Sequence, residues 1–184
     1  NTVQLARHAV PAPEINTKDE VLGRLNGRRL WIPYACEAAH VLAALFRAYG
    51  FNAEVLPRSQ DPGLNLARAS IPEDVCLPAL MTTEDMLLRA QQPDFDPEKE
   101  AFFQGKSEGP CRFGMYHILQ KRIFDRLGLR TVDIITIGNR DPDAGLGTFF
   151  SLVAWDAFLV HDLLQKMLLH TRPYEVEAGA SDAI

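Results

Sequence analysis

Apolar residues follow two alternating patterns along this chain. Short apolar runs bounded by polar residues have the length of buried strands, and longer stretches place apolar side chains at helical spacing. The run RLWIPY is followed by EAAHVLAALFRAYG, a helical stretch that ends at Gly50, and then directly by NAEVLP. A strand, a helix and a second strand with such short connections predict a βαβ unit whose strands are parallel.

The alternation continues along the rest of the chain. We expect further strands at 101–104 and 132–137, and helices at 64–68, 76–92, 113–127 and behind the loop GNRDPDAGLG. This pattern predicts an α/β fold, in which a parallel sheet carries helices on both faces as a flavodoxin-like or Rossmann-like three-layer lobe.

Three segments of the chain differ in character. Residues 1–26 contain two prolines and little periodicity, which is typical of a linker or an arm. Residues 27–147 are expected to form the α/β domain that bears the cysteines. Residues 148–184 are expected to be a C-terminal helix and the start of a further, truncated lobe, because the chain ends at GASDAI without a closing element.

Composition narrows the class of protein. Of the 184 residues, 47% are hydrophobic and 23% are charged, which is typical of a globular chain with a hydrophobic core. The formal net charge of -5 provides no basic field for nucleic acid. The longest apolar stretch, 149–170, is interrupted by charged residues, so we expect no membrane span. No signal-peptide pattern opens the chain, and the expected location is cytoplasmic.

Three widely spaced cysteines, Cys36, Cys76 and Cys111, are the main candidates for chemistry. An odd number of cysteines in a chain of this length favours free thiols, metal ligands or catalysis over disulfides. Each cysteine follows one of the first three predicted strands, and loops after parallel strands emerge at one edge of the sheet. Cys76 and Cys111 also open predicted helices, where the helix dipole favours a thiolate. Ligands on separate loops without a CxxC pair fit an iron–sulfur cluster better than structural zinc.

These residues also have plainer interpretations. Free cysteine is often a small apolar filler, and this alternative is strongest for Cys36. It is weakest for Cys111, because GPCRFG places two glycines and a proline around one thiol, as in a shaped loop. Arg112 is either a partner for a cluster sulfide or a CoA phosphate, or a surface salt-bridge residue. His40 and His117, one helical turn beyond Cys36 and Cys111, are candidates for a supporting role.

Two other groups have structural interpretations. Carboxylates flank the helix that Cys76 opens, and we interpret them as charges that complement a helix dipole; they are Glu73, Asp74, Glu84 and Asp85. Aromatic residues make the final helix unusually apolar, which favours a buried core helix or, alternatively, an exposed face for a partner; they are Phe149, Phe150, Trp155 and Phe158.

Three segments, IPYACEAAHVLAALFRAYGFNAEVLP, EDVCLPALMTTEDML and EGPCRFGMYHILQKRIFDRLGL, carry a resemblance to a known family. The chain resembles the 2-hydroxyacyl-CoA dehydratase superfamily, especially proteins that join a dehydratase-like region to a CoA-enzyme-activase-like ATPase region. The resemblance implies a [4Fe–4S] or double-cubane cluster on three cysteines, reduced by one electron from an ATP-hydrolysing partner. It makes Cys76 and Cys111 cluster ligands. The third ligand is either Cys36 or a residue beyond Ile184.

Two function hypotheses from different classes follow. In the first, the chain is an iron–sulfur protein for one-electron chemistry on an acyl-CoA or similar substrate, as an enzyme or as an electron relay; no catalytic residue is assigned. Its expected partners are the activase domain or subunit, the acyl-CoA and, in a homodimer, a second copy. In the second, it is a non-catalytic scaffold or assembly lobe that has the fold without the cluster. Ligand spacing disfavours a third interpretation, a zinc-binding structural domain.

Overall fold

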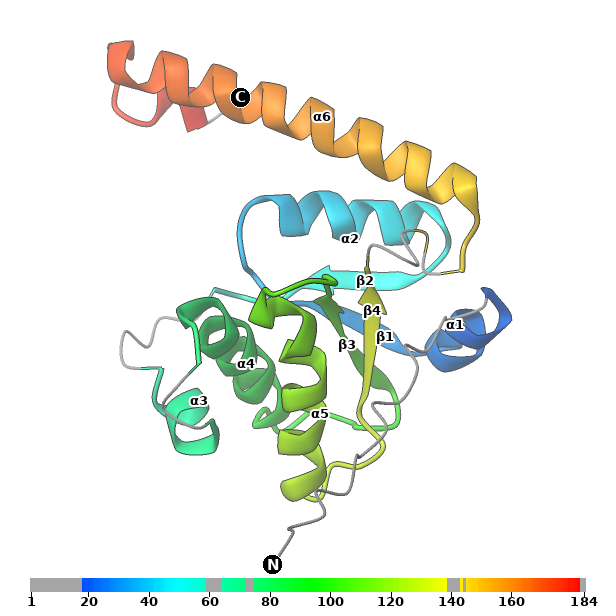
Figure 1. The fold of residues 1–184 in the computed structure, drawn as a ribbon. Coiled ribbons are helices and arrows are strands. Elements are labelled where there is room, and N and C mark those ends of the chain that lie inside the picture. The colour runs from blue at the N-terminus through cyan, green and yellow to red at the C-terminus, as the bar shows by residue number, and fades with distance from the viewer. Residues whose placement is uncertain (1–17, 59–63, 72–74, 139–142, 144, 183–184) are drawn as a thin grey trace, which may run out of the picture.

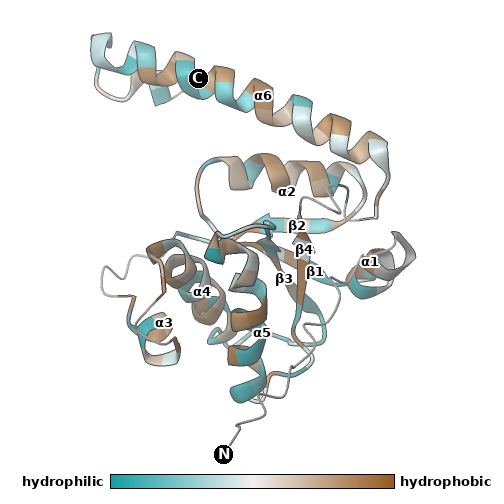
Figure 2. Cartoon of the chain, in the orientation of Figure 1, coloured by the Kyte–Doolittle hydropathy of each residue, from teal (hydrophilic) through white to brown (hydrophobic). Residues whose placement is uncertain are grey.

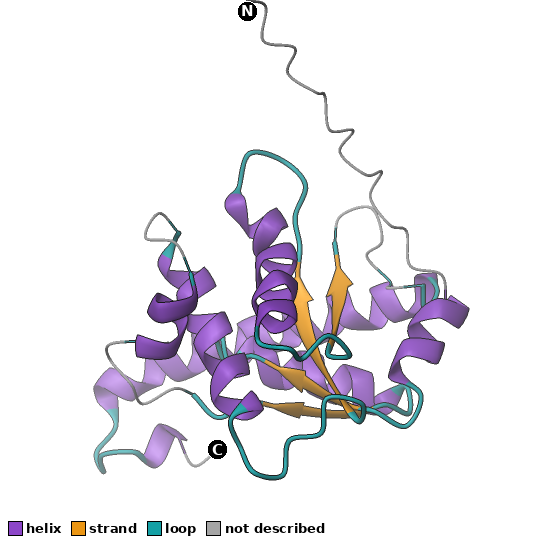
Figure 3. Cartoon of the chain, turned by 90° about the horizontal axis from the view of Figure 1, so that it is seen from below, coloured by secondary structure: helices purple, strands orange, loops and turns teal. Residues whose placement is uncertain are grey.

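A four-stranded, all-parallel sheet forms the centre of the computed structural model, which describes residues 18–58, 64–71, 75–138, 143 and 145–182 (Figure 1). The strands lie in the order β2-β1-β3-β4. Their bounds are β1 Arg29–Ile32, β2 Asn52–Val55, β3 Glu100–Gly105 and β4 Asp133–Ile137. The predicted parallel α/β sheet is therefore confirmed. Seen past the helices in Figure 3, the strands turn strongly from one to the next, as twisted sheets do.

Helices cover both faces of the sheet. The α-helices are α1 Lys18–Leu25, α2 Ala38–Ala48, α3 Asn65–Ser70, α4 Leu77–Ala90, α5 Tyr116–Arg126 and α6 Thr148–Thr171. Three short 3₁₀ turns are η1 Arg112–Met115, η2 Arg172–Tyr174 and η3 Ala180–Asp182. In Figure 1, α2 and α6 lie above the sheet, and α3, α4 and α5 lie below it. The predicted three-layer arrangement is thus present.

Alternate side chains of the strands supply the two hydrophobic cores, as the period of two in a strand requires. Leu30, Phe103 and Ile135 pack on the side of α1, α2 and α6. Trp31 and Phe102 pack on the opposite side, against α3, α4 and α5. Because both faces are covered, β1, β3 and β4 are largely buried on both sides, which explains their apolar runs; the edge strand β2 exposes Asn52 and Glu54.

The order of the strands places a ligand position between β1 and β3. The chain passes from β1 to β2 on one side, then crosses to β3 on the other side of β1. In open α/β sheets, ligands bind outside the carboxyl ends of the strands where the order reverses. The loops 33–37 and 106–111 follow β1 and β3 and therefore flank this position.

Helix α1 lies in the segment expected to be a linker or an arm. Its side chains Val21 and Leu25 are buried in the core beneath α2. Arg24 donates two hydrogen bonds to the carboxylate of Asp133 on β4, at 2.7 and 2.6 Å. Burial raises the pKa of Asp133, but the Arg24 guanidinium outweighs it and holds that pKa below its ordinary value. Residues 18–25 therefore pack as part of the layer that covers the sheet.

The final helix is longer than the surface that it covers. Helix α6 has 24 residues and α2 has 11, so α6 is about 36 Å long and α2 about 17 Å. Phe150 is buried against α2, whereas Phe149 and Trp155 are exposed. The expectation of a buried core helix is therefore wrong for most of α6, which is exposed; that the exposed face serves a partner stays a prediction. No helix in the described part of the chain is long and apolar enough to cross a membrane.

Candidate functional site at the carboxyl edge of the sheet

Cys76 opens α4, as the sequence predicts. It is the N-cap residue, its backbone is extended, and Pro78 stands in the first turn. Its half-buried thiol lies 2.7 Å from the hydroxyl oxygen of Tyr116, the first residue of α5. Tyr116 was not among the candidates predicted from the sequence. The only sign of Tyr116 in the sequence was a hydroxyl group among the apolar positions of the helix expected at 113–127. Its partner, Cys76, lies 40 residues earlier in the chain.

The environment of Tyr116 keeps its hydroxyl protonated. Burial raises the pKa of Tyr116 to about 12, and the hydrogen bond to Cys76 adds to the shift. A phenol that keeps its proton at neutral pH can donate a hydrogen bond to a sulfur atom. Hydrogen bonds of this kind orient and tune thiolates that bind metals. Cys111 raises and Arg112 lowers the same pKa, so both charges act on the same phenol.

Cys111 does not open an α-helix, and this part of the prediction is wrong. It precedes the four-residue 3₁₀ turn η1 with extended backbone, and α5 begins only at Tyr116. The loop folds back on itself here, and the tighter 3₁₀ winding accommodates that return. One 3₁₀ turn has no appreciable dipole, so the helix-dipole argument applies to Cys76 alone. The Cys111 side chain is exposed, which also excludes a core-filler role.

The loop after β3 has the fixed shape that its glycines and proline predict. Gly109 has φ +133°, which favours glycine. A Cβ on Gly114 would collide with the carbonyl oxygen of Ser107, and a Cβ on Gly105 would lie 2.9 Å from the Phe113 ring. The Phe113 ring in turn meets Tyr116 edge-on, with centroids 5.3 Å apart. The loop is thereby held against the phenol that contacts Cys76.

Replacing Gly114 with Ala is expected to destabilise the protein by about 1–3 kcal/mol, because the new methyl group collides with backbone that has little room to move. Gly23→Ala is the matched control, since Gly23 lies on the exposed face of α1 and no atom lies within 4 Å of the place its methyl group would take. That change is expected to stabilise the helix by about 0.5–1 kcal/mol. Urea unfolding followed by circular dichroism measures both. Equal effects would contradict the close approach at Ser107.

A buried polar cluster joins the elements that carry the site. The side-chain amide of Gln120 on α5 donates to Thr82 on α4 at 3.1 Å and to Gln104 on β3 at 2.9 Å. All three residues are buried. Buried hydrogen bonds between side chains hold their elements in one arrangement. The relative placement of Cys76, Cys111 and Tyr116 therefore rests on rigid elements beneath them.

Two carboxylates near this edge have a different role from the predicted one. Glu84 and Asp85 lie in the middle of α4 and are buried, whereas charges that complement a helix dipole lie in its exposed first turn. Glu84 accepts a hydrogen bond from the Ala67 backbone N–H at 2.6 Å. Asp85 accepts one from the Tyr34 N–H at 3.1 Å. They anchor α3 and the loop after β1. The other two predicted carboxylates, Glu73 and Asp74, lie outside the described residues.

Cys36 lies at the same edge of the sheet but near a different tyrosine. Its side chain is exposed in the loop after β1, so the core-filler interpretation is wrong here too. Its neighbour is Tyr34, whose hydroxyl donates to Glu37. That hydrogen bond raises the pKa of Tyr34, and Cys36 adds a smaller effect in the same direction. Cys76 thus contacts Tyr116, whose pKa Cys111 also raises, whereas Cys36 raises the pKa of Tyr34.

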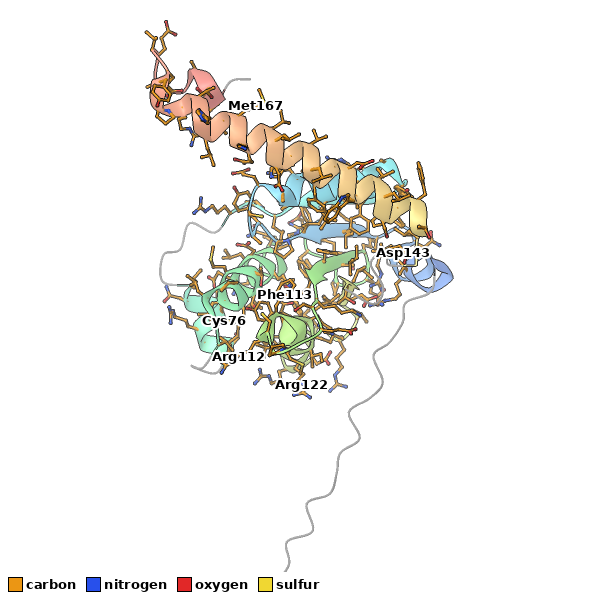
Figure 4. The ribbon with its side chains drawn as sticks, turned by 45° about the horizontal axis from the view of Figure 1, so that its top comes forward. Cys76, Arg112, Phe113, Arg122, Asp143 and Met167 are labelled. Carbon is orange, nitrogen blue, oxygen red and sulfur yellow. The ribbon has the colours of Figure 1, made fainter. Side chains whose placement is uncertain are left out.

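The remaining candidates are distributed around this edge. Arg112 is exposed beside Cys111, and Figure 4 shows it on the same side of the molecule as Cys76 and Phe113. His117 is half-buried in the first turn of α5, one position after Tyr116. His40 is exposed, with its ring 6.1 Å from that of Tyr34. The two histidines therefore follow the same division as the cysteines.

The donor set fits part of a cluster site. Among the described residues, no three His, Cys, Asp or Glu side chains gather into a group that could hold a metal ion. Cys76 and Cys111 offer two soft sulfur ligands, which suit iron–sulfur clusters, and the Tyr116 hydroxyl offers a hydrogen bond to one of them. The residues present would supply two ligands of a cluster, and its other ligands would have to come from elsewhere.

Comparison with protein families, with curated proteins and with solved structures finds no match for this chain. The resemblance to the dehydratases stays a hypothesis, and function has to be argued from the residues.

Proposed function

We propose that this chain is an iron–sulfur protein related to the 2-hydroxyacyl-CoA dehydratases, with Cys76 and Cys111 as ligands of a [4Fe–4S] or double-cubane cluster. The observation that supports this most strongly is the 2.7 Å contact between the Cys76 sulfur and the Tyr116 hydroxyl, with Cys111 acting on the same phenol. Two thiols and a hydrogen-bond donor at the ligand-binding edge are what a cluster edge needs.

Each residue has a distinct role in this proposal. Cys76 and Cys111 bind iron through their sulfur atoms, and the Tyr116 hydroxyl donates a hydrogen bond to the Cys76 sulfur. Arg112, exposed beside Cys111, binds an anionic group such as a CoA phosphate. When bound, the cluster supplies one-electron reduction, with an ATP-hydrolysing activase as the electron source. The remaining ligands come from Cys36, from a second copy or from another part of a longer protein, and a reducing cytoplasm suits free thiols.

A second candidate function is a scaffold or assembly lobe without a cluster. Two observations favour it: no three metal-ligating side chains gather among the described residues, and α6 exposes a long apolar face. It predicts a stable, folded protein that binds no iron. The two functions therefore differ in one measurable property, the binding of iron.

Anaerobic purification, reconstitution with iron and sulfide, and analysis of both elements test the proposal. Wild-type protein is expected to hold about four irons per cluster, per chain or per pair of chains, with the brown colour and electron paramagnetic resonance signal of a reduced cluster. Cys76→Ala and Cys111→Ala are each expected to lose most of this iron, because each removes a thiolate ligand. Cys36→Ala removes the third thiol at the same edge, which is exposed like that of Cys111, and shows whether Cys36 is one of the remaining ligands.

Tyr116→Phe separates a ligand from a residue that supports one. It should retain iron but move the reduction potential to a more negative value, because the sulfur loses a hydrogen-bond donor. Colourless wild-type protein after reconstitution contradicts the proposal and favours the scaffold function. Retained iron in both the Cys76 and Cys111 variants would also overturn the assignment, and loss of iron in Cys36→Ala would add that residue to the ligands.

A further inference from the structure

Helix α6 has a second apolar face that points away from the domain. Its members are 47% to 72% exposed: Phe149, Leu152, Trp155, Leu159, Val160, Leu163, Leu164 and Met167. At 3.6 residues per turn they fall on one side of the helix, opposite Phe150 and Ala154, which pack against α2. In Figure 2, apolar residues run along the whole of α6, which extends past α2. We call this surface the α6 stripe.

The α6 stripe has the spacing of a coiled-coil seam. Positions 149, 152, 156, 159, 163, 166 and 170 follow one another at intervals of three and four residues. The seam is apolar at Leu152, Leu159 and Leu163. Two charged residues of opposite sign, Asp156 and Lys166, occupy it at equal distances on either side of position 161. Both are exposed.

We propose that the α6 stripe pairs with the α6 stripe of a second copy of this chain, in an antiparallel arrangement whose register is set by Asp156 and Lys166. Placing position 161 at the twofold axis brings Asp156 opposite Lys166 of the second copy, and by symmetry this happens twice. The same register brings Leu159 opposite Leu163 and Trp155 opposite Met167. This one register pairs the two charges and the central apolar residues, and towards its ends it sets Leu152 opposite His170.

Other arrangements of two stripes lack this match. A parallel pair in register sets Asp156 against Asp156 and Lys166 against Lys166, which repel each other. Shifting the antiparallel pair by one heptad sets Asp156 against Leu159 and Lys166 against Phe149, so that charges lose their partners. A lipid surface is a poor occupant, because helices that lie on membranes are rich in basic residues, whereas α6 has one lysine and two aspartates.

Sedimentation equilibrium of charge-reversed variants tests the pairing. The wild-type chain is expected to dimerise, and Asp156→Lys and Lys166→Asp are each expected to weaken the dimer at least tenfold, because each creates two like-charged pairs. An equimolar mixture of the two variants should form a heterodimer of near wild-type affinity. The double variant D156K/K166D should recover the homodimer. Both positions are exposed, so unfolding midpoints should change little.

A parallel pair would give a different pattern. Each single variant would keep two like-charged pairs, as the wild-type pair has, so its dimer would be no weaker than that of the wild type. The mixture would place Lys opposite Asp at both positions and would bind more tightly than the wild type. A wild-type chain that stays monomeric at high micromolar concentration overturns the proposal and leaves the stripe to another segment of a longer protein or to a different partner. The pairing does not depend on the cluster, so a colourless protein that dimerises as described would contradict the proposed function alone.

Discussion

Arg89→Met is expected to lower the free energy of unfolding by about 3–5 kcal/mol, because it leaves a buried carboxylate without its cation. Arg89 and Glu100 have side chains that are only 10% and 7% exposed. Arg89 donates to both oxygens of Glu100, at 2.8 and 2.5 Å, and Glu100 also accepts from the Trp31 indole N–H at 2.5 Å. The bonds to Glu100 hold the pKa of Arg89 above its ordinary value. Urea unfolding measures the loss.

Two further variants decide whether the buried pair is the cause. Asp94→Asn removes the charge of the exposed partner of Arg89, since the Asp94 side chain is 72% accessible. This change should have no measurable effect on the free energy of unfolding. The double variant R89M/E100L removes both buried charges and should recover much of the stability that R89M loses. The pair lies at the start of β3, away from the cysteines, so the iron content of the folded protein should not change. A loss below about 1 kcal/mol for R89M would contradict the account.

Phe46→Ala is expected to cost about 3–5 kcal/mol, because it leaves a cavity at the centre of the core between α2 and the sheet. Phe46 is fully buried, and its ring lies 5.9 Å from Phe51, 5.9 Å from Phe103 and 5.7 Å from Phe150. Phe150 is the buried residue of α6, so this cluster holds α6 on α2. The change should therefore also release the start of α6.

Amide hydrogen exchange separates these two effects of Phe46→Ala. Exchange in the first turns of α6 should rise more than exchange in α4 and α5, which pack on the other face of the sheet. Phe46→Leu fills most of the space and should show both effects at reduced size. An equal rise throughout the chain would show that α6 is held by other contacts.

Much of the fold could be predicted because three of its four strands are buried on both faces. β4 and β1 appear as continuous apolar runs, and α2 has clear helical spacing between β1 and β2. The loop after β3, by contrast, leads into the 3₁₀ turn η1 before α5 begins, and it brings Gly114 close to the Ser107 carbonyl. The shape of the loop sets the distance between Gly114 and Ser107. The spacing of apolar residues along the sequence gives no information on that distance.

The site could be predicted only to the level of its edge. Topology correctly brought the three cysteines to loops at the carboxyl ends of the strands, yet Tyr116 was missed because its partner lies on another helix. The roles of Glu84 and Asp85 were predicted wrongly for a related reason. A carboxylate on a helix is usually solvated, whereas Glu84 and Asp85 are buried and accept hydrogen bonds from the backbone N–H groups of Ala67 and Tyr34.

The sequence by itself determined the parallel α/β sheet, the positions of its strands and of the helices after β1, and the edge to which its cysteines belong. These properties follow from local periodicity and from the rule that successive parallel strands are crossed in one hand. The tertiary structure decided that Cys76 contacts Tyr116 across two helices, that Cys36 lies near Tyr34 instead, and that α6 exposes an apolar stripe. Each of these depends on how helices and loops pack against one another. That packing depends on the lengths of the helices and on the shapes of side chains from distant parts of the sequence.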